Sequence, residues 1–172
     1  MLDSKMEKAI NKQIVAELYS AYLYLSMSAY FESEGLSGMA GWMRAQFQEE
    51  QLHAFKMFDY VAERGGRVKL GAIDEPPSDW DSPLAVFEHT LEHERKVTGL
   101  INKLVDLAQE TSDYATDSFL RWYVTEQVEE ESTADEIRQK LKMIGDHGQG
   151  LLMLDRELGA RVFSQPSSAG EE

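Results

Sequence analysis

Residues 49–61 read EEQLHAFKMFDYV, and this stretch decides the fold. Glu50, His53, Met57 and Val61 recur at intervals of three and four residues, which is the spacing of one face of an α-helix. Such a face normally packs into a core, yet here it carries a carboxylate and an imidazole. We therefore predict a core-facing helix that brings ionisable side chains into the protein interior.

The same helical period runs through three more long stretches and one short one, and strand signals are nearly absent. We predict an all-α four-helix bundle with long helices at about 4–34, 39–64, 83–110 and 114–145, and a short fifth helix at about 151–162. The first helix opens on a capping-box pattern, with Ser4 as N-cap and Glu7 three residues later. Residues 1–162 are expected to form one domain, and residues 163–172 a flexible tail.

The connection between the second and third helices, residues 66–81, is long for a loop in a compact domain. A crossover along the bundle explains its length, because a helix of about 27 residues is roughly 40 Å long and an extended loop of this size returns that far. The second and third helices would then be parallel. Ser82 and Pro83 are typical of a helix start, and the short turn at 111–113 predicts antiparallel third and fourth helices.

The composition limits the function classes. The chain has 172 residues, a formal net charge of −14 and no cysteine. The negative charge argues against a nucleic-acid partner, and the lack of cysteine excludes disulfides, iron–sulfur clusters and Cys-ligated zinc. The N-terminus is too polar for a signal peptide and no apolar run is long enough for a membrane span, so we expect a cytoplasmic protein without a membrane partner.

Each long helix places one acid near the middle of its predicted inner row: Glu17, Glu50, Glu94 and Glu130. An unpaired buried carboxylate costs several kcal/mol, so four of them in one core require a strongly cationic partner. Oxygen ligands with one imidazole suit iron or manganese better than copper or structural zinc. The predicted inner rows are Ile10, Ile14, Glu17, Ala21, Tyr24 and Ser28; Phe47, Glu50, His53, Met57 and Val61; Phe87, Leu91, Glu94, Ile101, Val105 and Ala108; and Phe119, Tyr123, Glu126, Glu130, Ala134, Ile137 and Leu141.

Glu50 and His53 form an E-x-x-H pattern, whose spacing puts both side chains on one helical face. Alone, this pattern is more typical of an exposed ion pair or hydrogen bond, and its significance comes from the three other acids. Tyr24 lies two turns after Glu17 and has two interpretations, a core tyrosine or a residue that hydrogen-bonds a ligand or donates an electron.

Two further groups of ionisable residues lie near these four acids. Glu49, Glu126 and Glu129 are compatible either with a solvated surface or with a third metal position. His89 and His93 are separated by four residues, a spacing that also suits metals, but they lie among charged residues and are predicted to be solvated.

The chain resembles the bacterial non-haem ferritins over nearly its whole length. The similarity lies in AELYSAYLYLSMSAYFE at 16–32, EEQLHAFKMFDYV at 49–61, EHTLEHE at 88–94 and EQVEEE at 126–131. The resemblance implies a ferroxidase centre with one iron held by Glu17, Glu50 and His53, and a second held by Glu50, Glu94 and Glu130. It also implies a third iron at Glu49, Glu126 and Glu129.

The fourth helix departs from a symmetric di-iron bundle, because Thr133 stands where a second histidine would be. Gln127 is expected to give only a weaker or water-mediated contact to the second iron. No haem is expected, since Gln51 stands where the haem-binding methionine of a bacterioferritin would be sought.

The resemblance further implies a shell of twenty-four copies of this chain that oxidises Fe(II) with O₂ or H₂O₂ and stores the ferric mineral. Two rival hypotheses remain at this stage. One is a di-iron peroxidase or oxygenase of the rubrerythrin kind, and the other is an acidic helical scaffold without catalytic metal.

Overall fold

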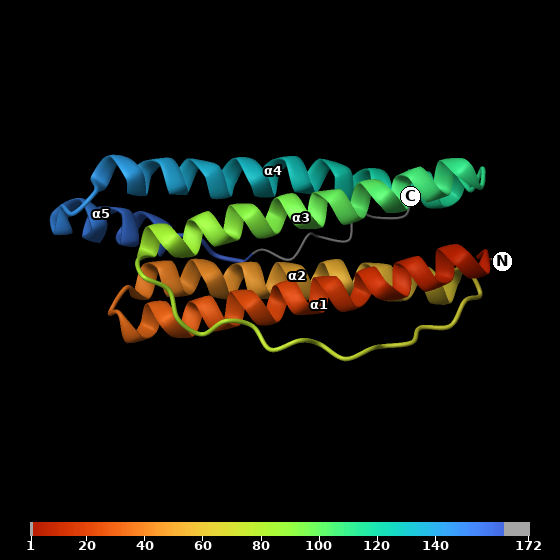
Figure 1. The fold of residues 1–172 in the computed structure, drawn as a ribbon, viewed down its shortest axis with the longest axis horizontal. Coiled ribbons are helices and arrows are strands. Elements are labelled where there is room, and N and C mark those ends of the chain that lie inside the picture. Colours follow the sequence, from red (N-terminus) through yellow and green to blue (C-terminus); the bar gives the residue numbers. More distant parts are fainter. Residues whose placement is uncertain (1, 164–172) are drawn as a thin grey trace.

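The computed structural model describes residues 2–163, and within that range the chain forms five α-helices and no strand (Figure 1). Their bounds are Ser4–Ser33 for α1, Ser37–Glu63 for α2, Pro83–Glu110 for α3, Tyr114–Ile144 for α4 and Gly148–Leu158 for α5. The four long helices form one bundle and α5 packs at its end, which confirms the predicted fold class. Residues 164–172 of the expected tail lie outside the described residues.

The crossover runs along the whole bundle. In Figure 1 the chain leaves α2 at one end, passes along the outside of α1, and enters α3 at the opposite end. The α1–α2 and α3–α4 pairs are therefore antiparallel, and α2 and α3 are parallel, as the loop length predicts. Asn11 fixes the start of the crossover, because its amide donates to the carbonyl of Arg67 at 3.0 Å and accepts from the N–H of Lys69 at 2.7 Å.

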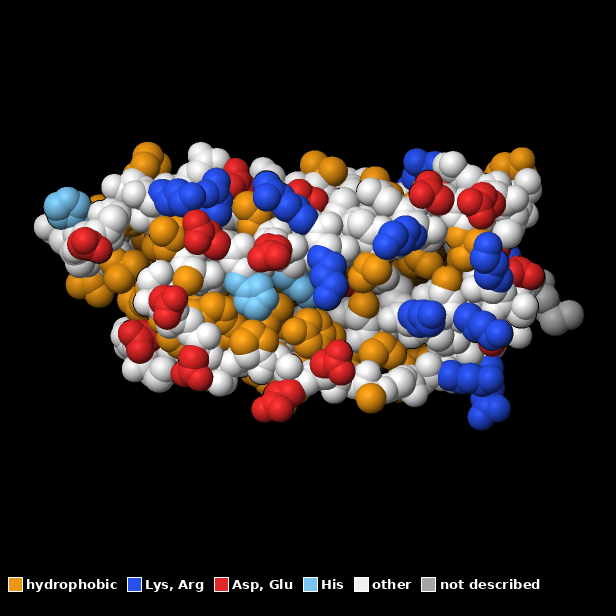
Figure 2. Space-filling view, viewed as in Figure 1, with side chains coloured by type: hydrophobic (Ala, Val, Ile, Leu, Met, Phe, Trp, Pro, Cys, Tyr) orange, Lys and Arg blue, Asp and Glu red, His pale blue; other side chains and the backbone are white. Residues whose placement is uncertain are grey.

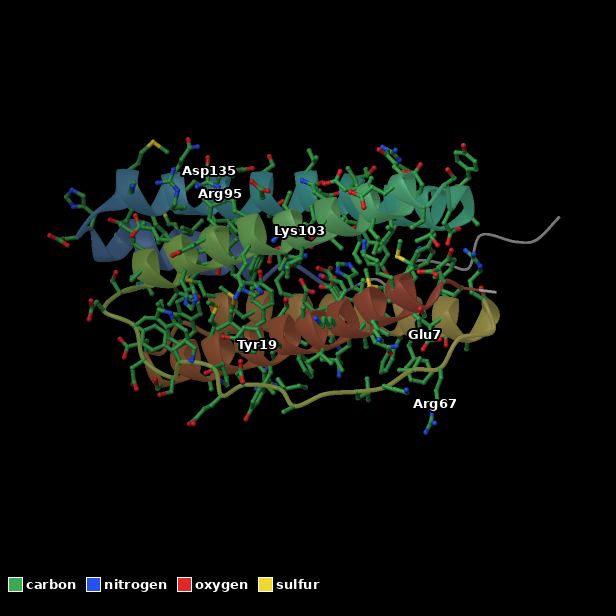
Figure 3. The ribbon with its side chains drawn as sticks, turned by 45° about the vertical axis from the view of Figure 1, so that its right-hand side comes forward. Glu7, Tyr19, Arg67, Arg95, Lys103 and Asp135 are labelled. Atoms are coloured by element: carbon green, nitrogen blue, oxygen red, sulfur yellow. The ribbon has the colours of Figure 1, made fainter. Side chains whose placement is uncertain are left out.

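Three predicted helix starts were wrong by one to three residues, and one of them is that of α2, which begins at Ser37 instead of about residue 39. Asp3, not Ser4, caps α1, since its carboxylate accepts from the N–H groups of Lys5 and Met6 and Ser4 is already helical. Glu7 does not complete a capping box but accepts from the N–H of Arg67 at 3.1 Å, and Figure 3 shows both residues where the crossover begins. The fifth helix begins at Gly148 instead of Leu151 and ends at Leu158.

The hydrophobic core is divided into two clusters along the bundle axis. One cluster takes its side chains from residues 6–14 of α1, 54–61 of α2, 97–108 of α3 and 120–123 of α4. The other takes them from residues 23–31, 36–43, 86–87 and 137–141, and from Leu154 and Leu158 of α5. Between these clusters lies a layer of polar side chains, and each long helix contributes to it the acid singled out in the sequence.

The predicted inner rows of α1 and α3 are buried throughout, whereas those of α2 and α4 need correction. On α4 the predicted Tyr123, Ala134, Ile137 and Leu141 are buried, whereas the predicted Phe119, Glu126 and Glu130 are only partly buried. Leu120 and Gln127, which were not predicted, are buried instead of Phe119 and Glu126. Phe119 stacks instead on Tyr60 of α2, and their ring centroids are 3.8 Å apart. The prediction for α4 is therefore wrong by one residue at positions 119 and 126 and correct at the buried apolar positions that follow. On α2, similarly, Gln46 is fully buried and the neighbouring Phe47 only partly.

Helix α5 is fixed to the start of α2. Leu36, the N-cap residue of α2, has no side chain that can accept a hydrogen bond, so the helix leaves N–H groups free. The buried carboxylate of Asp155 on α5 accepts from one of them, the N–H of Met39, at 2.8 Å. Gly38 allows this approach, because a Cβ there would overlap the backbone carbonyl of Asp155.

The outer surface is charged and of mixed sign. Figure 2 shows acidic side chains over the end of this face near α5 and basic side chains gathered toward the end where the chain begins. Arg95 on α3 and Asp135 on α4 lie close together on the outer face in Figure 3. The pKa of Asp135 is lowered chiefly by hydrogen bonds from Arg138 and Gln139, and to a smaller extent by the charge of Arg95. None of the described helices is long and apolar enough to cross a membrane.

Candidate metal centre

The polar layer of the core holds the four predicted acids. Glu17 on α1, Glu50 on α2 and Glu94 on α3 are each at most 2% exposed. Glu130 on α4 is partly buried. Helical periodicity places them there, since each occupies a position that the apolar residues of its own row would otherwise fill. Four carboxylates thus come from four helices into one layer.

Three of the predicted site residues form a compact group. Glu17, Glu50 and His53 each offer one ligand atom, and these atoms lie within 4.8 Å of one another. The imidazole Nδ1 of His53 lies 3.6 Å from a carboxylate oxygen of Glu50, one turn away on α2. Tyr123 on α4 donates its hydroxyl to the backbone carbonyl of His53 at 2.8 Å, which fixes α2 against α4 beside this group.

Side-chain amides orient three of the carboxylates. Gln13 donates to Glu17 at 3.0 Å, from one turn earlier on α1. Gln46 donates to Glu130 at 2.8 Å, from α2 to α4. Each contact holds one oxygen of the carboxylate and leaves the other available.

Gln127 is the amide partner of the third carboxylate. It donates to Glu94 at 3.1 Å and also to the backbone carbonyl of the same residue. The sequence predicts a weak or water-mediated contact of Gln127 to a metal, and in the structure its amide N–H donates to Glu94. Tyr24 likewise donates its phenol to Glu94, so it is a hydrogen-bond partner of a carboxylate in the polar layer.

Among the buried carboxylate oxygens of residues 2–163, two have no hydrogen-bond partner: Oε2 of Glu17 and Oε2 of Glu50. Burial, followed by the charge of Glu50, raises the pKa of Glu17 to about 8. Burial, followed by the charge of Glu94, raises the pKa of Glu130 to about 7. The pKa values of Glu50 and Glu94 are also raised, again chiefly by burial.

Such a group of acids is compatible with one folded core in two ways. Either the acids carry protons, or a cation of high charge neutralises them. Free carboxylate oxygens beside one imidazole offer the donor set that suits iron or manganese, and no thiolate is present to favour copper or a structural zinc. Glu17, Glu50 and His53 therefore fit such an ion. Because binding displaces protons from acids with raised pKa values, metal affinity falls as the pH is lowered.

The second acidic group lies beside this layer, toward the outside of α2 and α4. Glu49 and Glu126 are partly buried and Glu129 is exposed. Burial is the first cause that raises the pKa of Glu126. Glu49 is paired with Arg161, whose Nη2 donates to it at 2.5 Å. The group is therefore neither wholly solvated nor buried with the four acids.

Several residues around the site were not predicted from the sequence, and for one residue the predicted exposure was wrong. Gln13 and Gln46 each lie one turn before an acid of the set, so the spacing could have indicated them. Arg161 follows the last helix and carries no periodic signal. The predicted solvation of His93 was wrong, since this side chain is 7% exposed and its Nε2 lies 2.8 Å from the hydroxyl of Ser20 on α1.

Comparison with known proteins agrees with this geometry. A family model described as ferritin-like domain matches residues 7–144. A protein named bacterial non-heme ferritin from Bacteroides fragilis is 52% identical over 161 residues, which cover 94% of this chain and 100% of the relative. A protein of the same name from Staphylococcus aureus is 36% identical over 165 residues, which cover 96% of this chain and 99% of the relative.

Solved structures give the same result. An open pore ferritin from the hyperthermophilic archaeon Archaeoglobus fulgidus superposes with a TM-score of 0.93 at 59% sequence identity. The match covers 94% of this chain and 100% of that chain. A bundle with one acid from each long helix, a full-length match in sequence and a full-length match in structure lead to one conclusion: this chain belongs to the ferritin family.

Proposed function

We propose that this chain oxidises Fe(II) at the centre formed by the four acids of its polar layer and stores the ferric product. The observation that carries the proposal is the pair of buried, unpartnered oxygens on Glu17 and Glu50 beside the imidazole of His53. Oxygens left without partners in a core cost free energy. A cation as substrate would satisfy them, and membership of the ferritin family supports iron as that cation.

Two Fe(II) ions bind side by side in this proposal. The first takes Glu17, Glu50 and His53 as ligands, and the second takes Glu50, Glu94 and Glu130. Glu50 bridges the two, which its position in the layer and its free oxygen support. The second set contains no imidazole, so it holds its ion less tightly than the first.

The carboxylate ligands favour oxidation, because hard anionic oxygens stabilise Fe(III) more than Fe(II). Each pair of Fe(II) ions gives up two electrons, which with two protons reduce O₂ to H₂O₂ or H₂O₂ to water. The acids with raised pKa values, Glu17 and Glu130, release protons when Fe(II) binds. Tyr24 hydrogen-bonds Glu94 and so lies within reach of an electron transfer to this centre.

Storage requires an enclosed volume, which one bundle does not provide. We propose that copies of this chain assemble into a shell of twenty-four subunits in the cytoplasm. Self-assembly is consistent with apolar side chains on the surface of the single chain, such as Phe55, Leu152 and Met153, which are 54%, 57% and 67% exposed. Glu49, Glu126 and Glu129 provide a third position, through which oxidised iron leaves the centre.

The proposal is tested by Glu50→Ala, with Glu63→Ala at the exposed end of the same helix as the matched control. Loss of the bridge should nearly abolish rapid Fe(II) oxidation, followed by ferric absorbance under air, while helical content and particle size stay unchanged. The metal-free variant should also melt at a higher temperature, because a buried acid with a raised pKa has been removed. Oxidation at the normal rate in Glu50→Ala would refute the site.

Iron loading separates storage from the rubrerythrin-like alternative. A storage shell takes up Fe(II) under air far beyond two ions per chain and keeps it in solution as a particle. A di-iron peroxidase or oxygenase saturates at about two ions per chain. Saturation at that ratio would be compatible with the proposed metal centre but would contradict the storage function.

A further inference from the structure

The chain that follows α5 returns to the metal centre. After Leu158 the described chain turns back along the bundle and passes behind α3 in the view of Figure 1. At residue 163 it lies beside residues of both α2 and α4. Its first residue, Gly159, is packed so closely on α2 that a Cβ there would lie 3.0 Å from the Cα of Gly38. The segment formed by residues 159–163 is therefore held at its start by the same contact that fixes α5.

Arg161 is the cation of this segment, and two side chains of α2 hold it. Its Nη2 donates to a carboxylate oxygen of Glu49 at 2.5 Å, and its guanidinium carbon lies 4.7 Å from the ring centroid of Trp42. The side chains of the ion pair are only 27% and 25% exposed, so water screens them less than a surface pair. Stacking on an aromatic ring and pairing with a carboxylate are both contacts that a planar guanidinium favours.

Phe163, the last described residue, lines a cavity of about 170 Å³ between α2 and α4. The other lining residues are Glu49, Leu52, His53, Trp122, Glu126 and Glu130. His53 and Glu130 belong to the proposed iron centre, and Glu49 and Glu126 to the neighbouring acidic group. The cavity thus lies between the proposed iron centre and the neighbouring acidic group. The segment 159–163, which lines the cavity through Phe163, also carries Arg161, the cation paired with Glu49.

We propose that Arg161 is a tethered counter-ion that competes with iron for Glu49 and so weakens the third iron position. An ion that leaves the centre must displace the guanidinium from Glu49 before that carboxylate can bind it. The displaced side chain then competes to return, which favours onward release of the ion rather than its retention. This inference rests on the proposed function and adds a control on the step after oxidation.

The test is equilibrium binding of Fe(II) without oxygen, counted per chain by titration calorimetry. Arg161→Gln removes the competing charge, and Arg156→Gln removes the same charge from an exposed position on α5. We expect the third ion to bind about tenfold more tightly in Arg161→Gln, which corresponds to about 1.4 kcal/mol and is the size of a hydrogen bond to a charged group. Arg156→Gln should bind all ions as the unchanged protein does.

A second background identifies the carboxylate through which Arg161 acts. In Glu49→Gln the guanidinium has no charged partner, so adding Arg161→Gln should leave the affinity for the third ion unchanged. Equal affinity for the third ion in the unchanged protein and in Arg161→Gln would overturn the inference. So would an equal gain in Arg156→Gln, or a gain that persists when Glu49 is already Gln.

The first two ions report separately on the proposed function. If they bind and the affinity for the third ion does not depend on Arg161, the inference fails but the proposed metal centre is unaffected. If no Fe(II) binds tightly in any variant, the proposed function fails and the inference falls with it.

Discussion

The phenol of Tyr24 on α1 donates a hydrogen bond to the carboxylate of Glu94 on α3. The second oxygen of that carboxylate accepts from the amide of Gln127 at 3.1 Å. Glu94 is therefore held at both oxygens, whereas Glu17 and Glu50 each keep one oxygen without a partner. The carboxylates of the layer thus differ in how firmly the protein orients them before any ion binds.

Tyr24→Phe should weaken the second iron position and spare the first. The substitution removes one donor from a buried carboxylate, which costs about tenfold in affinity if the bond is worth as much as others to charged groups. Anaerobic titration with Fe(II) resolves the two positions. Tyr30→Phe, on the same helix but packed against Trp80, is the control. Equal weakening of both positions would contradict the assignment of Glu94 to the second.

The metal-free protein should lose stability as the pH rises from about 5 to about 8. The pKa of Glu17 is raised to about 8 and that of Glu130 to about 7, against 4.5 for an ordinary Glu. Between these values the folded state binds more protons than the unfolded state, so the free energy of unfolding falls with increasing pH. Each pKa unit is worth about 1.4 kcal/mol, so the melting temperature should drop by several degrees.

Calorimetric melts at several pH values test this expectation, and Glu17→Gln is the informative variant. It removes one titrating group, so its melting temperature should depend less on pH than that of the unchanged protein. A saturating divalent ion should remove the trend altogether, because it binds the deprotonated acids. A metal-free protein whose stability rises through this pH range would show that the four acids are not protonated in the core.

Gly38→Ala should detach α5 while leaving the four-helix bundle folded. A Cβ at this position would overlap the backbone carbonyl of Asp155, so either α5 or the start of α2 must move. Gly41→Ala is the matched control, since a Cβ there meets no atom within 4 Å. The control should gain about 0.5–1 kcal/mol from helix propensity, whereas Gly38→Ala should lose about 1–3 kcal/mol.

Particle size distinguishes the two effects in Gly38→Ala. Size-exclusion chromatography should show impaired assembly at unchanged helical content, because α5 is fixed to the bundle at this point. A normal shell with normal melting would mean that the start of α2 adapts at no cost, and that the contact with Asp155 does not determine where α5 lies.

The polar layer was predictable because each acid lies on a helical row whose other members are apolar. The inner rows of α1 and α3 are buried throughout as predicted, since their apolar residues keep the period without interruption. On α4 several glutamates stand side by side, so the period alone could not separate Glu126 from its neighbour Gln127. The structure buries Gln127 because Glu94 on α3 accepts from its amide, a partner that the sequence of α4 does not contain.

Residues whose role depends on contacts between distant segments could not be predicted. Arg161 lies 112 positions from Glu49 in the sequence, and no helical spacing connects them. His93 has charged neighbours in sequence, which favours solvation, yet it is covered by α1 and bonded to Ser20. Both cases require the path of the chain, which a local pattern does not give.

His93→Gln should make the protein more resistant to acid. Burial, followed by the charges of His89 and Lys96, lowers the pKa of His93 to about 4, against 6.5 for an ordinary His. Between these values the unfolded state binds the extra proton, so the stability that His93 contributes is present above about pH 6.5 and is lost as the pH falls toward 4. His93 therefore makes the free energy of unfolding rise with pH, whereas the buried glutamates make it fall.

Glutamine does not titrate and keeps a polar group near Ser20. The variant therefore removes the loss of stability at low pH without leaving the position empty. Against the unchanged protein, metal-free His93→Gln should gain about 2–3 kcal/mol at about pH 4, and it should gain nothing at about pH 7.5. Chemical denaturation at both pH values measures the difference. His147→Gln, at an exposed position before α5, should change neither value. The buried glutamates change the stability of both proteins in the same way, so the difference between the two free energies of unfolding reports on His93 alone. If that difference does not change with pH, the imidazole accepts its proton in the folded state and the prediction is wrong.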